Sequence, residues 1–507
     1  MSQESTPALP QRALEALTAQ IAGTVCTPGD ADYAREVSAF NLRSRTRSAL
    51  VVAATTSDDV QAAIRFATAH GLGVGVLSTG HHPYPPNTSD GSLLITTRAM
   101  RAVHIDPATA TARVEAGALW GDVVGPAQRY GLAPLNGSSA GVGVVGYTLG
   151  GGLSPVLGRA YGWAADHVRA IAVVTADGAL RHVTEQSDPA LFWVLRGGGS
   201  NFGVVTALEF SLFPVNTFYG GGIFHPAERA ESVLHAYRQV AAQAPDELTV
   251  SVALLNFPPL PQIPELLRGR FVVHVRVAYL GADTEAEELI APLRAVGTPL
   301  ADTIGRRGYD TFAEVHQDPT EPAPYEDRSV LLTELTPGGV AAVLDRVGPA
   351  SASAVTVLEI RHLAGALGRE PRLPSATGAR DAAFMVWGAV VGPPDVVDAG
   401  IDRMNSLLKD LTPWSTSRLY QNFTSREAVA ADVFDPPVLA RLRRIKQQYD
   451  LGNVFRAHNR NIPPALSPHA RASTAPAQVT SRPSSDSVLV TTTQQPDSGS
   501  AGTSITR

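Results

Sequence analysis

Residues 192–206, FWVLRGGGSNFGVVT, combine three local patterns in one short stretch. The apolar residues of 188–195 predict a short helix, the glycines of 197–203 predict a loop, and 204–212 predict a strand that ends before Pro214. A helix that leads into a strand through such a loop indicates a fold that mixes helices and strands. Glycine also lets the backbone approach a bulky ligand closely, so this loop is a candidate binding segment.

Two further glycine clusters lie in the same part of the chain. A predicted strand at 74–77 runs into Ser-Thr-Gly-His at 78–81, and GSSAGVGVVGYTLGGG fills 137–152. Any one cluster is explained most simply by tight turns. Three clusters in one domain favour a cradle for the pyrophosphate of a dinucleotide, because glycine loops turn backbone N–H groups toward anionic oxygens. The clusters lack Gly-Lys-Ser/Thr and a clean G-x-G-x-x-G with a later acidic residue, which argues against a P-loop and a Rossmann NAD site.

Outward from these clusters, the pattern changes near residue 216. Before it, strands at 49–54 and 74–77 flank a predicted helix with Ser57 as its N-cap and Gly71 at its end, which resembles a βαβ unit. After it, long strands alternate with helices, which predicts a second α+β domain with a largely antiparallel sheet. The predicted strands are 249–255, 271–280, 354–363 and 383–391, and the predicted helices are 284–295, 395–411 and 437–449.

The sequence thus predicts an α+β fold in five parts. The C-terminal part is rich in Ser, Thr, Pro and Gln and has too few apolar residues to offset the entropy of ordering, so we expect it to be disordered. The parts are an N-terminal arm (1–44), a ligand-binding domain of two α+β subdomains (45–215), a substrate-binding α+β domain (216–414), a C-terminal segment (415–464) and a disordered tail (465–507).

Composition excludes several classes of protein. The 507 residues are 44% hydrophobic and 17% charged, with a net charge of −6 and no long basic run, unlike a nucleic-acid binder. The single cysteine, Cys26, excludes an intrachain disulfide and a cysteine-based metal site, and we expect no metal. The N-terminus lacks a signal-peptide pattern, and no apolar run approaches the roughly 20 residues of a membrane span. We therefore expect a cytoplasmic protein without membrane partners.

The ordered motifs resemble those of the FAD-linked oxidases of the vanillyl-alcohol-oxidase superfamily, more narrowly the berberine-bridge-enzyme-like family. Residues 77–81 resemble the loop with the flavin-linking histidine, 142–152 resemble V-G-x-G-G-x-x-x-G-G-G, and 192–206 match a characteristic segment. Near the C-terminus, 420–423 and 453–463 are similar to the segment that covers the flavin, with one extra residue before Asn459. The resemblance implies that the first domain is a PCMH-type FAD-binding domain and that the C-terminal segment returns to it.

The resemblance also implies which residues hold FAD. Many relatives attach the flavin twice, through this histidine and through a cysteine just before the glycine motif, but that position is Ser139 here. Because serine is a far weaker nucleophile than a thiolate, we predict one covalent link, through His81. The predicted cofactor-binding residues are Ser78, Thr79, Gly80, His81, His82, Ser139, Val142, Gly143, Gly146, Tyr147, Gly150, Gly151, Gly152, Asn201, Gly203, Val205, Asn459 and Asn461.

Val142 lies where the resemblance places the residue that gates oxygen access to the flavin. A small valine there is similar to the oxidase type, whereas the alternative is that Val142 only packs.

A flavin oxidation also needs a base near the reacting carbon. The resemblance implies that Tyr420 faces the substrate, and we expect its pKa, ordinarily about 10, to be lowered by the site. Asn422 lies two residues later and would share a strand face with Tyr420, where it could orient the flavin or the phenol. The alternative is that Tyr420 is a half-buried aromatic residue of a sheet.

Glu359 and Arg361 are candidate substrate-binding residues. The alternation of strand 355–362 puts Val355, Val357, Glu359 and Arg361 on one face. The two charged side chains would either form an ion pair on the sheet or line a substrate pocket over the flavin.

The resulting functional prediction is an FAD-dependent oxidoreductase. We expect it to oxidise an alcohol, sugar or amine centre by hydride transfer to flavin N5, with O2 as acceptor and H2O2 as product, in natural-product (secondary) metabolism. The alternatives are an oxidative cyclase or dehydrogenase acting on a polycyclic metabolite, and a flavin-binding scaffold without catalytic activity. The expected partners are a small-molecule substrate and O2.

Overall fold

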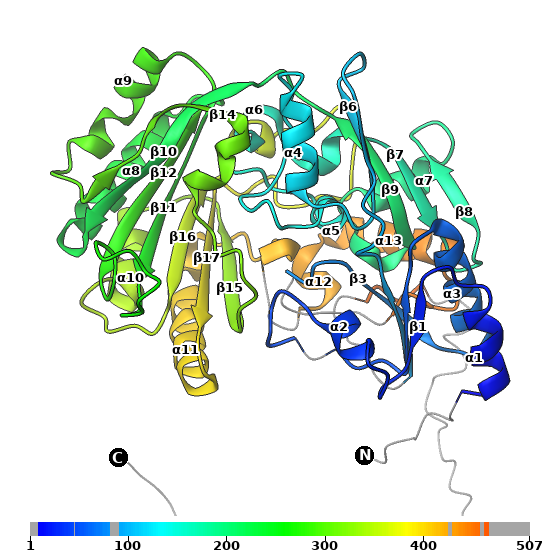
Figure 1. Ribbon diagram of the computed structural model, residues 1–507. Helices are drawn as coiled ribbons and strands as arrows, with labels where there is room; N and C mark the ends of the chain where they lie inside the picture. Colours follow the sequence, from blue (N-terminus) through cyan, green and yellow to red (C-terminus); the bar gives the residue numbers. More distant parts are fainter. Residues whose placement is uncertain (1–8, 45, 82–90, 424–427, 457–460, 466–507) are drawn as a thin grey trace, which may run out of the picture. The chain divides into compact units, whose positions relative to one another are not determined.

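The computed structural model describes residues 9–44, 46–81, 91–423, 428–456 and 461–465. These residues form three sheets with helices packed around them (Figure 1). The predicted C-terminal tail, His82 and Asn459 lie outside the described residues.

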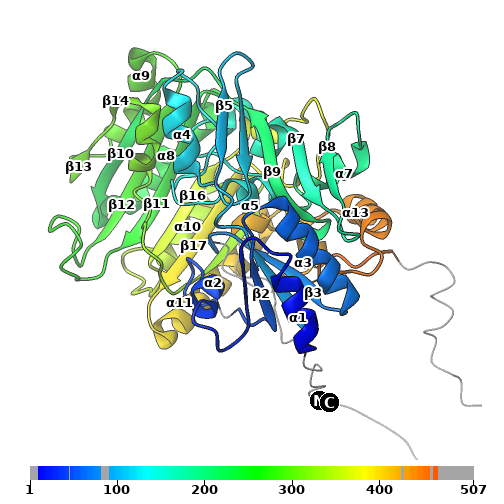
Figure 2. The same ribbon diagram turned by 45° about the vertical axis from the view of Figure 1, so that its right-hand side comes forward.

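The first sheet has four strands in the order β1-β2-β4-β3. β2, β4 and β3 run parallel, and β1 pairs antiparallel with β2. α1 and α3 lie against this sheet (Figure 2), and their apolar residues pack in its core. The helix after β2 begins one residue earlier than predicted, because Thr56 and not Ser57 is its N-cap and accepts the N–H of Asp59. The elements are α1 (Gln11–Thr18), β1 (Thr24–Cys26), α2 (Tyr33–Val37), β2 (Leu50–Ala53), α3 (Ser57–Ala69), β3 (Gly73–Leu77) and β4 (Ser92–Thr96).

The second sheet has five antiparallel strands in the order β5-β6-β9-β7-β8. Its apolar side packs on α4, α5 and α7, and α13 from the C-terminal part of the chain joins the same core. The strands are β5 (Val103–Asp106), β6 (Thr111–Glu115), β7 (Val168–Val174), β8 (Leu180–Val183) and β9 (Val204–Ser211). The helices are α4 (Trp120–Gln128), α5 (Val144–Leu149), α6 (Gly158–Tyr161), α7 (Pro189–Leu195), α12 (Ala430–Val433) and α13 (Pro436–Tyr449).

The third sheet contains eight strands, and all of its pairs are antiparallel. The order is β13-β10-β12-β11-β16-β17-β15, and β14 also pairs with β10. Its strands are β10 (Thr217–Pro226), β11 (Leu248–Asn256), β12 (Phe271–Tyr279), β13 (Ala301–Asp302), β14 (Gly305–Gly308), β15 (Tyr325–Leu332), β16 (Val357–His362) and β17 (Phe384–Val391). Its helices are α8 (Ala230–Gln243), α9 (Asp283–Arg294), α10 (Pro337–Val347) and α11 (Pro394–Asp410).

The two faces of the third sheet have different neighbours. One face is covered by the apolar sides of α8, α9, α10 and α11, which lie along the outer side of the sheet in Figure 1. On the other face, Leu331 and Met385 pack against Leu153, Trp163 and Tyr420. Alternation along β16 therefore directs its odd-numbered residues toward the part of the chain that contains the glycine clusters.

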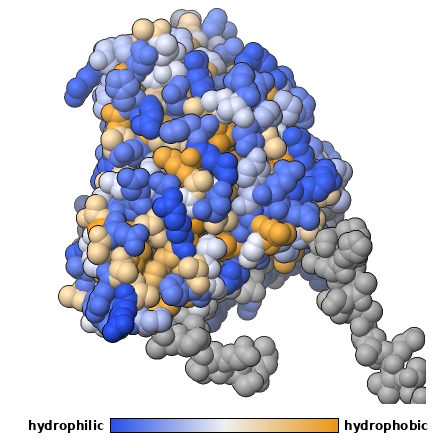
Figure 3. Space-filling model, turned by 90° about the vertical axis from the view of Figure 1, so that its right-hand side faces the viewer, coloured by the Kyte–Doolittle hydropathy of each residue, from blue (hydrophilic) through white to orange (hydrophobic). Residues whose placement is uncertain are grey.

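The predicted α+β class is confirmed, as is the antiparallel sheet that follows residue 216. On the face drawn in Figure 3, hydrophilic residues alternate with small hydrophobic patches (Figure 3). Among the residues that the structure describes, no helix combines the length and the apolar character needed to cross a bilayer.

Candidate functional site

The loop 78–81 follows β3 and is held by the segment 39–41. The backbone N–H of Phe40 donates to the carbonyl oxygen of Thr79 (2.9 Å), and that of Asn41 donates to Gly80 (3.2 Å). Gly80 has φ of +71°, and a Cβ atom there would overlap Ala39, so this position requires glycine. The turn thereby fixes the direction in which His81 leaves the backbone.

The imidazole of His81 is held from one side only. It stacks on the ring of Phe40, with 3.9 Å between ring centroids, and the hydroxyl of Tyr325 donates to its carbonyl oxygen (2.5 Å). Nδ1 is buried and has no hydrogen-bond partner in the described part of the chain. Burial lowers the pKa of His81 to about 4, against a small opposing effect of Asp318, so the ring is neutral at pH 7. A neutral ring with an unpartnered nitrogen is suited to bond formation or ligand contact.

The start of the second glycine cluster lies beside this loop. The N–H of Gly141 donates to Oγ of Ser139 (3.3 Å), and a Cβ atom at Gly141 would lie 3.9 Å from Cε1 of His81. A Cβ atom at Gly143 would lie 3.4 Å from Oγ of Ser78, which is buried without a hydrogen-bond partner. The structure thus brings the first two clusters together.

Ser139, which stands where the resemblance implies a second flavin link in relatives, lies where these two glycine clusters meet. Cys26 is instead buried in β1, and burial raises its pKa to about 11, so it is not a reactive thiolate. Val142 is half-buried on the same turn, between Gly141 and Gly143.

α5 connects this turn to the glycines at its C-terminal end. Tyr147 of α5 donates its hydroxyl hydrogen to the carbonyl oxygen of Leu135 (3.0 Å) and packs edge-on against Trp120. Gly152 has φ of +76°, and a Cβ atom there would come within 2.6 Å of the Tyr147 ring. Gly146 is exposed, whereas Gly150, Gly151 and Gly152 are buried.

Tyr420 and Asn422 lie against these glycines, but not on a strand as predicted. Residues Gln421–Phe423 form a 3₁₀ helix (η7), which Tyr420 directly precedes. Nδ2 of Asn422 donates to the carbonyl oxygen of Tyr147 (2.9 Å) and to the hydroxyl of Tyr420 (3.2 Å). A side chain at Gly150 would overlap the Asn422 amide. The two residues therefore meet through a short turn that docks on the end of α5.

The environment of Tyr420 also differs from the prediction. The ring is buried between Trp163 and Phe423 and is not half-buried in a sheet. Burial raises the pKa of Tyr420, and this outweighs the opposite effects of nearby backbone N–H groups, Asn422 and Arg361. The expectation of a lowered pKa was wrong, because the apolar neighbours remove more hydration than the donors replace.

The third glycine cluster is held by the C-terminal part of the chain. Nε2 of Gln421 donates to the carbonyl oxygen of Gly197 (2.6 Å), and Oδ1 of Asn201 accepts the N–H of Ile462 (2.8 Å). Asn461 precedes Ile462 and has a buried Oδ1 without a hydrogen-bond partner. Gly203 and Val205 have packing roles, since Gly203 lies directly against β7 and Val205 is part of the second sheet's core.

A buried lysine, which sequence reasoning missed, completes this connection. Nζ of Lys446 donates to Oδ2 of Asp450 (2.6 Å), to the carbonyl oxygen of Asn201 (2.6 Å) and to that of Phe455 (3.3 Å). Asp450 also accepts the N–H groups of Val454 and Phe455. The available signal was that Lys446 is one of two lysines in the chain and precedes Asp450 by one helical turn.

Glu359 and Arg361 form the predicted ion pair, with 2.9 Å between Oε2 and Nη2. The carboxylate also binds Arg276 (2.9 Å), lies 3.3 Å from Nε2 of His316, and accepts the hydroxyl of Ser251 (2.7 Å). Burial alone would raise the pKa of Glu359, but Arg361 and Arg276 hold it well below its usual range. His316 is therefore part of the cluster. Val355 lies before β16 and does not share the strand's alternation.

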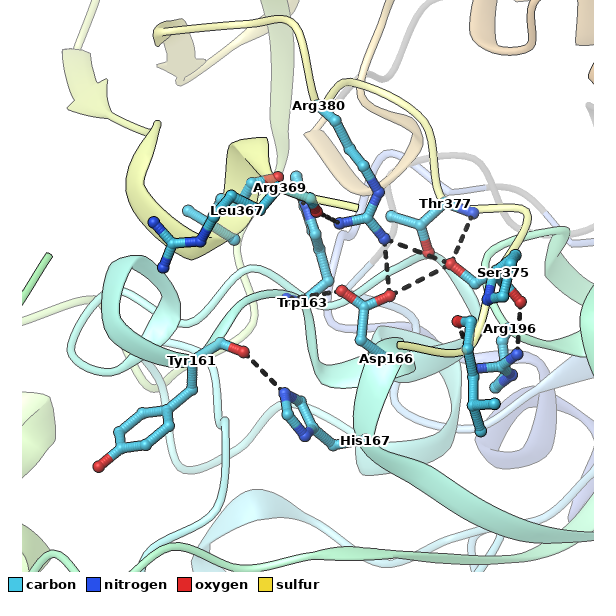
Figure 4. A network of polar contacts seen from close by, with 12 residues as sticks. Tyr161, Trp163, Asp166, His167, Arg196, Leu367, Arg369, Ser375, Thr377 and Arg380 are labelled. Carbon is cyan, nitrogen blue, oxygen red and sulfur yellow. Dashed lines mark hydrogen bonds and ion pairs between the residues drawn. The ribbon is translucent and has the colours of Figure 1, made fainter. Parts of the chain in front are cut away.

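A further polar network attaches the segment between β16 and β17 to the second sheet's domain (Figure 4). Oδ1 of Asp166 pairs with Arg380 (2.7 Å) and accepts the hydroxyl of Ser375 (3.2 Å). Nε1 of Trp163 donates to the carbonyl oxygen of Leu367 (2.9 Å), and Arg196 donates to two carbonyl groups of residues 373–374. This network fixes Thr377, whose side chain and backbone lie directly against Gly151 and Gly197.

Comparison with known proteins identifies the family. The family model described as "FAD binding domain" matches residues 48–184. The chain is 31% identical to (R)-6-hydroxynicotine oxidase of Paenarthrobacter nicotinovorans over 88% of this chain and 97% of the relative. The chain belongs to the FAD-linked oxidoreductase family. The family resemblance inferred from the motifs is therefore confirmed, as is the prediction of an oxidoreductase enzyme.

Solved structures of FAD-linked oxidoreductases share the fold. The crystal structure of 6-hydroxy-D-nicotine oxidase from Arthrobacter nicotinovorans has a TM-score of 0.74 and 28% identity, covering 88% of this chain and 98% of that one. A berberine-bridge-enzyme-like protein of Physcomitrella patens has a TM-score of 0.77 at 18% identity, covering 90% of this chain and 100% of that one. The expected PCMH-type architecture is thus confirmed.

The described residues fit the FAD of this FAD-linked oxidoreductase. Among the buried polar atoms at or beside its glycine clusters, Nδ1 of His81, Oγ of Ser78 and Oδ1 of Asn461 have no hydrogen-bond partner among the described residues. Unpartnered buried polar atoms cost free energy unless a ligand or water binds them. Within the described part of the chain, no group of His, Cys, Asp or Glu side chains is arranged to hold a metal ion.

Proposed function

We propose that this FAD-dependent oxidoreductase holds its flavin through one covalent bond, to His81, and oxidises an alcohol, sugar or amine centre with O2 as acceptor. The observation that carries the proposal is the buried, unpartnered Nδ1 of His81 beside Ser139. The same turn offers a neutral imidazole and, in place of a thiol, a hydroxyl that is a poor nucleophile. The described cofactor-binding candidates would surround the flavin from three sides, and His82 and Asn459 remain sequence predictions.

The chain's own residues would position the substrate and handle one proton. When bound, FAD supplies a two-electron acceptor for the hydride that leaves the substrate C–H bond. Tyr420 would take the proton from the adjacent O–H or N–H group, while Asn422 donates to the phenol oxygen. Backbone N–H groups of Gly152 and Leu153 also favour the phenolate form of Tyr420. The two electrons and two protons lost by the substrate appear in H2O2.

The substrate class is proposed from the relatives. One relative is described as (R)-6-hydroxynicotine oxidase, and two solved structures of the same fold are described as a chitooligosaccharide oxidase and a xylooligosaccharide oxidase. These names support an amine or carbohydrate alcohol as substrate and oxygen as acceptor. The small side chain of Val142 beside Gly143 is consistent with access of O2 to the site.

Acid precipitation of the purified protein tests the covalent link. We expect the yellow colour to remain in the pellet of the wild type and of Ser139→Ala, and to stay in the supernatant for His81→Ala. A peptide map should place the flavin on His81. Colour that remains in the His81→Ala pellet would contradict the proposal. Peroxide release on a panel of 6-hydroxynicotine, oligosaccharides, alcohols and amines then tests the oxidase activity.

A further inference from the structure

A small cavity lies between the third sheet and residues 153–155, on the face of the sheet opposite α8–α11. Its volume is about 20 Å³, which is enough for one water-sized group and too small for a whole substrate. Three arginines line it: Arg159, Arg276 and Arg361. None of the described residues that line it carries a carboxylate. The cavity therefore suits a single polar atom of a larger ligand.

Two of the three arginines are held by several hydrogen bonds or ion pairs to other residues of the protein. Arg159 donates to the carbonyl oxygens of Leu248, Ala244, Pro245 and Leu363, and its Nη1 lies 3.2 Å from Nε2 of His362. Arg276 pairs with Glu359, donates to the carbonyl oxygen of His316 (3.2 Å), and donates to Nδ1 of His274 (3.3 Å). These bonds make both guanidinium groups part of the framework.

Arg361 is different. It is only 6% exposed, and its Nη2 pairs with Glu359, but its Nε is buried without a hydrogen-bond partner. Its guanidinium carbon lies 4.8 Å from the centre of the Phe423 ring, which in turn stacks on Tyr420. Arg361 thus presents an unused donor at the cavity, next to the residue proposed to move the proton.

Arg159 has Asp246 and Glu247 nearby, whereas Arg276 and Arg361 place two positive charges beside one carboxylate. Glu359 is the single carboxylate shared by Arg276 and Arg361. The two histidines of the lining are neutral and leave this charge unchanged, because burial and the neighbouring arginines lower their pKa values, that of His362 to about 3. An oxygen that carries negative charge would restore the balance, whereas an ammonium group would be repelled.

We infer that Arg361 binds an anionic oxygen of the substrate, such as a carboxylate, phenolate or enolate oxygen, in this cavity. The inference rests on the proposed function, since it narrows the substrate of that site to molecules that carry an acidic group in addition to the oxidised centre. The Nε–H of Arg361 would donate to that oxygen, and its guanidinium charge, which Glu359 neutralises only in part, would attract it. Phe423 would keep the guanidinium in place.

The test compares benzoate with benzamide and benzylamine, which have similar shapes and carry a negative, no and a positive charge. Each is titrated into the holoenzyme at pH 7.5, and binding is followed by isothermal titration calorimetry and by the change in flavin absorbance. We expect benzoate to bind at least 10-fold more tightly than benzamide, and benzylamine more weakly than both.

Variants assign this preference to Arg361. Arg361→Gln should reduce the benzoate preference to less than about twofold, and Arg361→Lys should retain part of it. Glu359→Gln removes the competing carboxylate and should strengthen benzoate binding, so the inference stays testable if Arg361→Gln does not fold. Arg113→Gln, an exposed position on β6, is the matched control for loss of one positive charge and should bind like the wild type.

Equal binding of benzoate and benzamide by the wild type would overturn the inference, as expected if the cavity holds only a structural water. A benzoate preference that survives Arg361→Gln, or that Glu359→Gln does not increase, would overturn it as well. The proposed function fails in a different way, through purified protein without flavin or without peroxide release. Calorimetry still measures the charge preference in that case and decides the inference separately.

Discussion

At the scale of single residues, the chemistry of the site depends on side chains that the fold keeps out of water. Tyr420 shows this most directly. An ordinary phenol is already neutral at pH 7, and burial raises the pKa of Tyr420 further, so a base of this kind works only in the small fraction of molecules that have lost the proton.

Tyr420→Phe should therefore change both rate and pH dependence. We expect wild-type kcat/KM to rise about tenfold per pH unit from pH 7 to 9, because the phenolate fraction rises by that factor below the pKa. Tyr420→Phe should lower kcat/KM by roughly 10²–10⁴-fold, abolish this slope and leave the bound flavin unchanged. The measurement is peroxide release across pH on the substrate that the panel identifies. An unchanged slope in the variant would exclude Tyr420 as the base.

His362 makes a pH prediction for stability. Burial and Arg159 hold its pKa at about 3, whereas an unfolded histidine has a pKa of about 6.5. Above pH 6.5 the ring is neutral in both states. Between pH 6.5 and about 3, the unfolded state binds a proton that the folded state does not. The free energy of unfolding therefore falls as the pH is lowered, by up to about 1.4 kcal/mol per pH unit.

Urea titrations between pH 7 and 4.5 measure this effect. His362→Gln keeps an acceptor for Arg159 but cannot titrate, so its stability should fall less steeply with acid than that of the wild type. His182→Gln, at an exposed position, is the control and should keep the wild-type slope. Equal slopes for all three proteins would contradict the assignment.

At the scale of secondary-structure elements, α13 and the chain that follows it hold the third glycine cluster. Lys446 lies at the centre of this contact, and its side chain has no exposed surface. Removing one partner of a buried ion pair leaves the other charge unpaired, which typically costs about 3–5 kcal/mol.

Lys446→Met should thus lower the free energy of unfolding by about 3–5 kcal/mol and speed up the loss of non-covalently held flavin in the His81→Ala background. Lys409→Met is the matched control, because it removes the only other lysine at an exposed site of α11, and it should change stability by less than about 0.5 kcal/mol. Urea denaturation and flavin fluorescence provide both values. A Lys446→Met protein as stable as the control would contradict this role.

The elements also show what sequence patterns can and cannot predict. The predicted strands at 271–280 and 383–391 and the helix at 395–411 are within one or two residues of β12, β17 and α11, because long apolar periodicities survive in the fold. β10 was not predicted, since its glycines at 220–222 weaken a strand pattern and are required by close neighbours such as His274.

The candidate site, like the secondary structure, was predictable from the sequence only in part. Ordered motifs were sufficient to place His81, Ser139 and Tyr420 in one region, because each motif is a local stretch of sequence. The partners of Glu359 were not predictable, since Arg276 meets Glu359 through the register of the third sheet, and His316 follows a separate 3₁₀ helix, Tyr309–Val315. The pKa of Tyr420 likewise depended on Trp163, which is distant in sequence.

At the scale of the whole molecule, polar contacts join the third sheet and its connections to the part of the chain that contains the first two sheets. The Asp166 network in Figure 4 is one of them, and both Asp166 and Arg380 have little exposed surface. Loss of the Asp166 network should let residues 365–382 open more often, and this would move Thr377 away from Gly151 and Gly197.

Asp166→Ala should increase amide hydrogen exchange in 365–382 by about 100-fold, which corresponds to roughly 3 kcal/mol for an unpaired buried arginine. Exchange in β12 should not change. Asp345→Ala, which removes an exposed carboxylate, is the control. Mass spectrometry of the exchanged protein resolves these segments, and protection in 365–382 equal to that of the control would show that the network is not needed to hold the segment.

The buried contact of Lys446 with Asn201 joins residues that are synthesised far apart in time. The ribosome exposes the first two sheets and all three glycine loops long before α13 emerges. Nascent chains that stop short of Lys446 would hence be incompetent to retain a coenzyme. Retention of the coenzyme must therefore wait for the synthesis of α13, so a polypeptide terminated before Lys446 should leave the ribosome colourless.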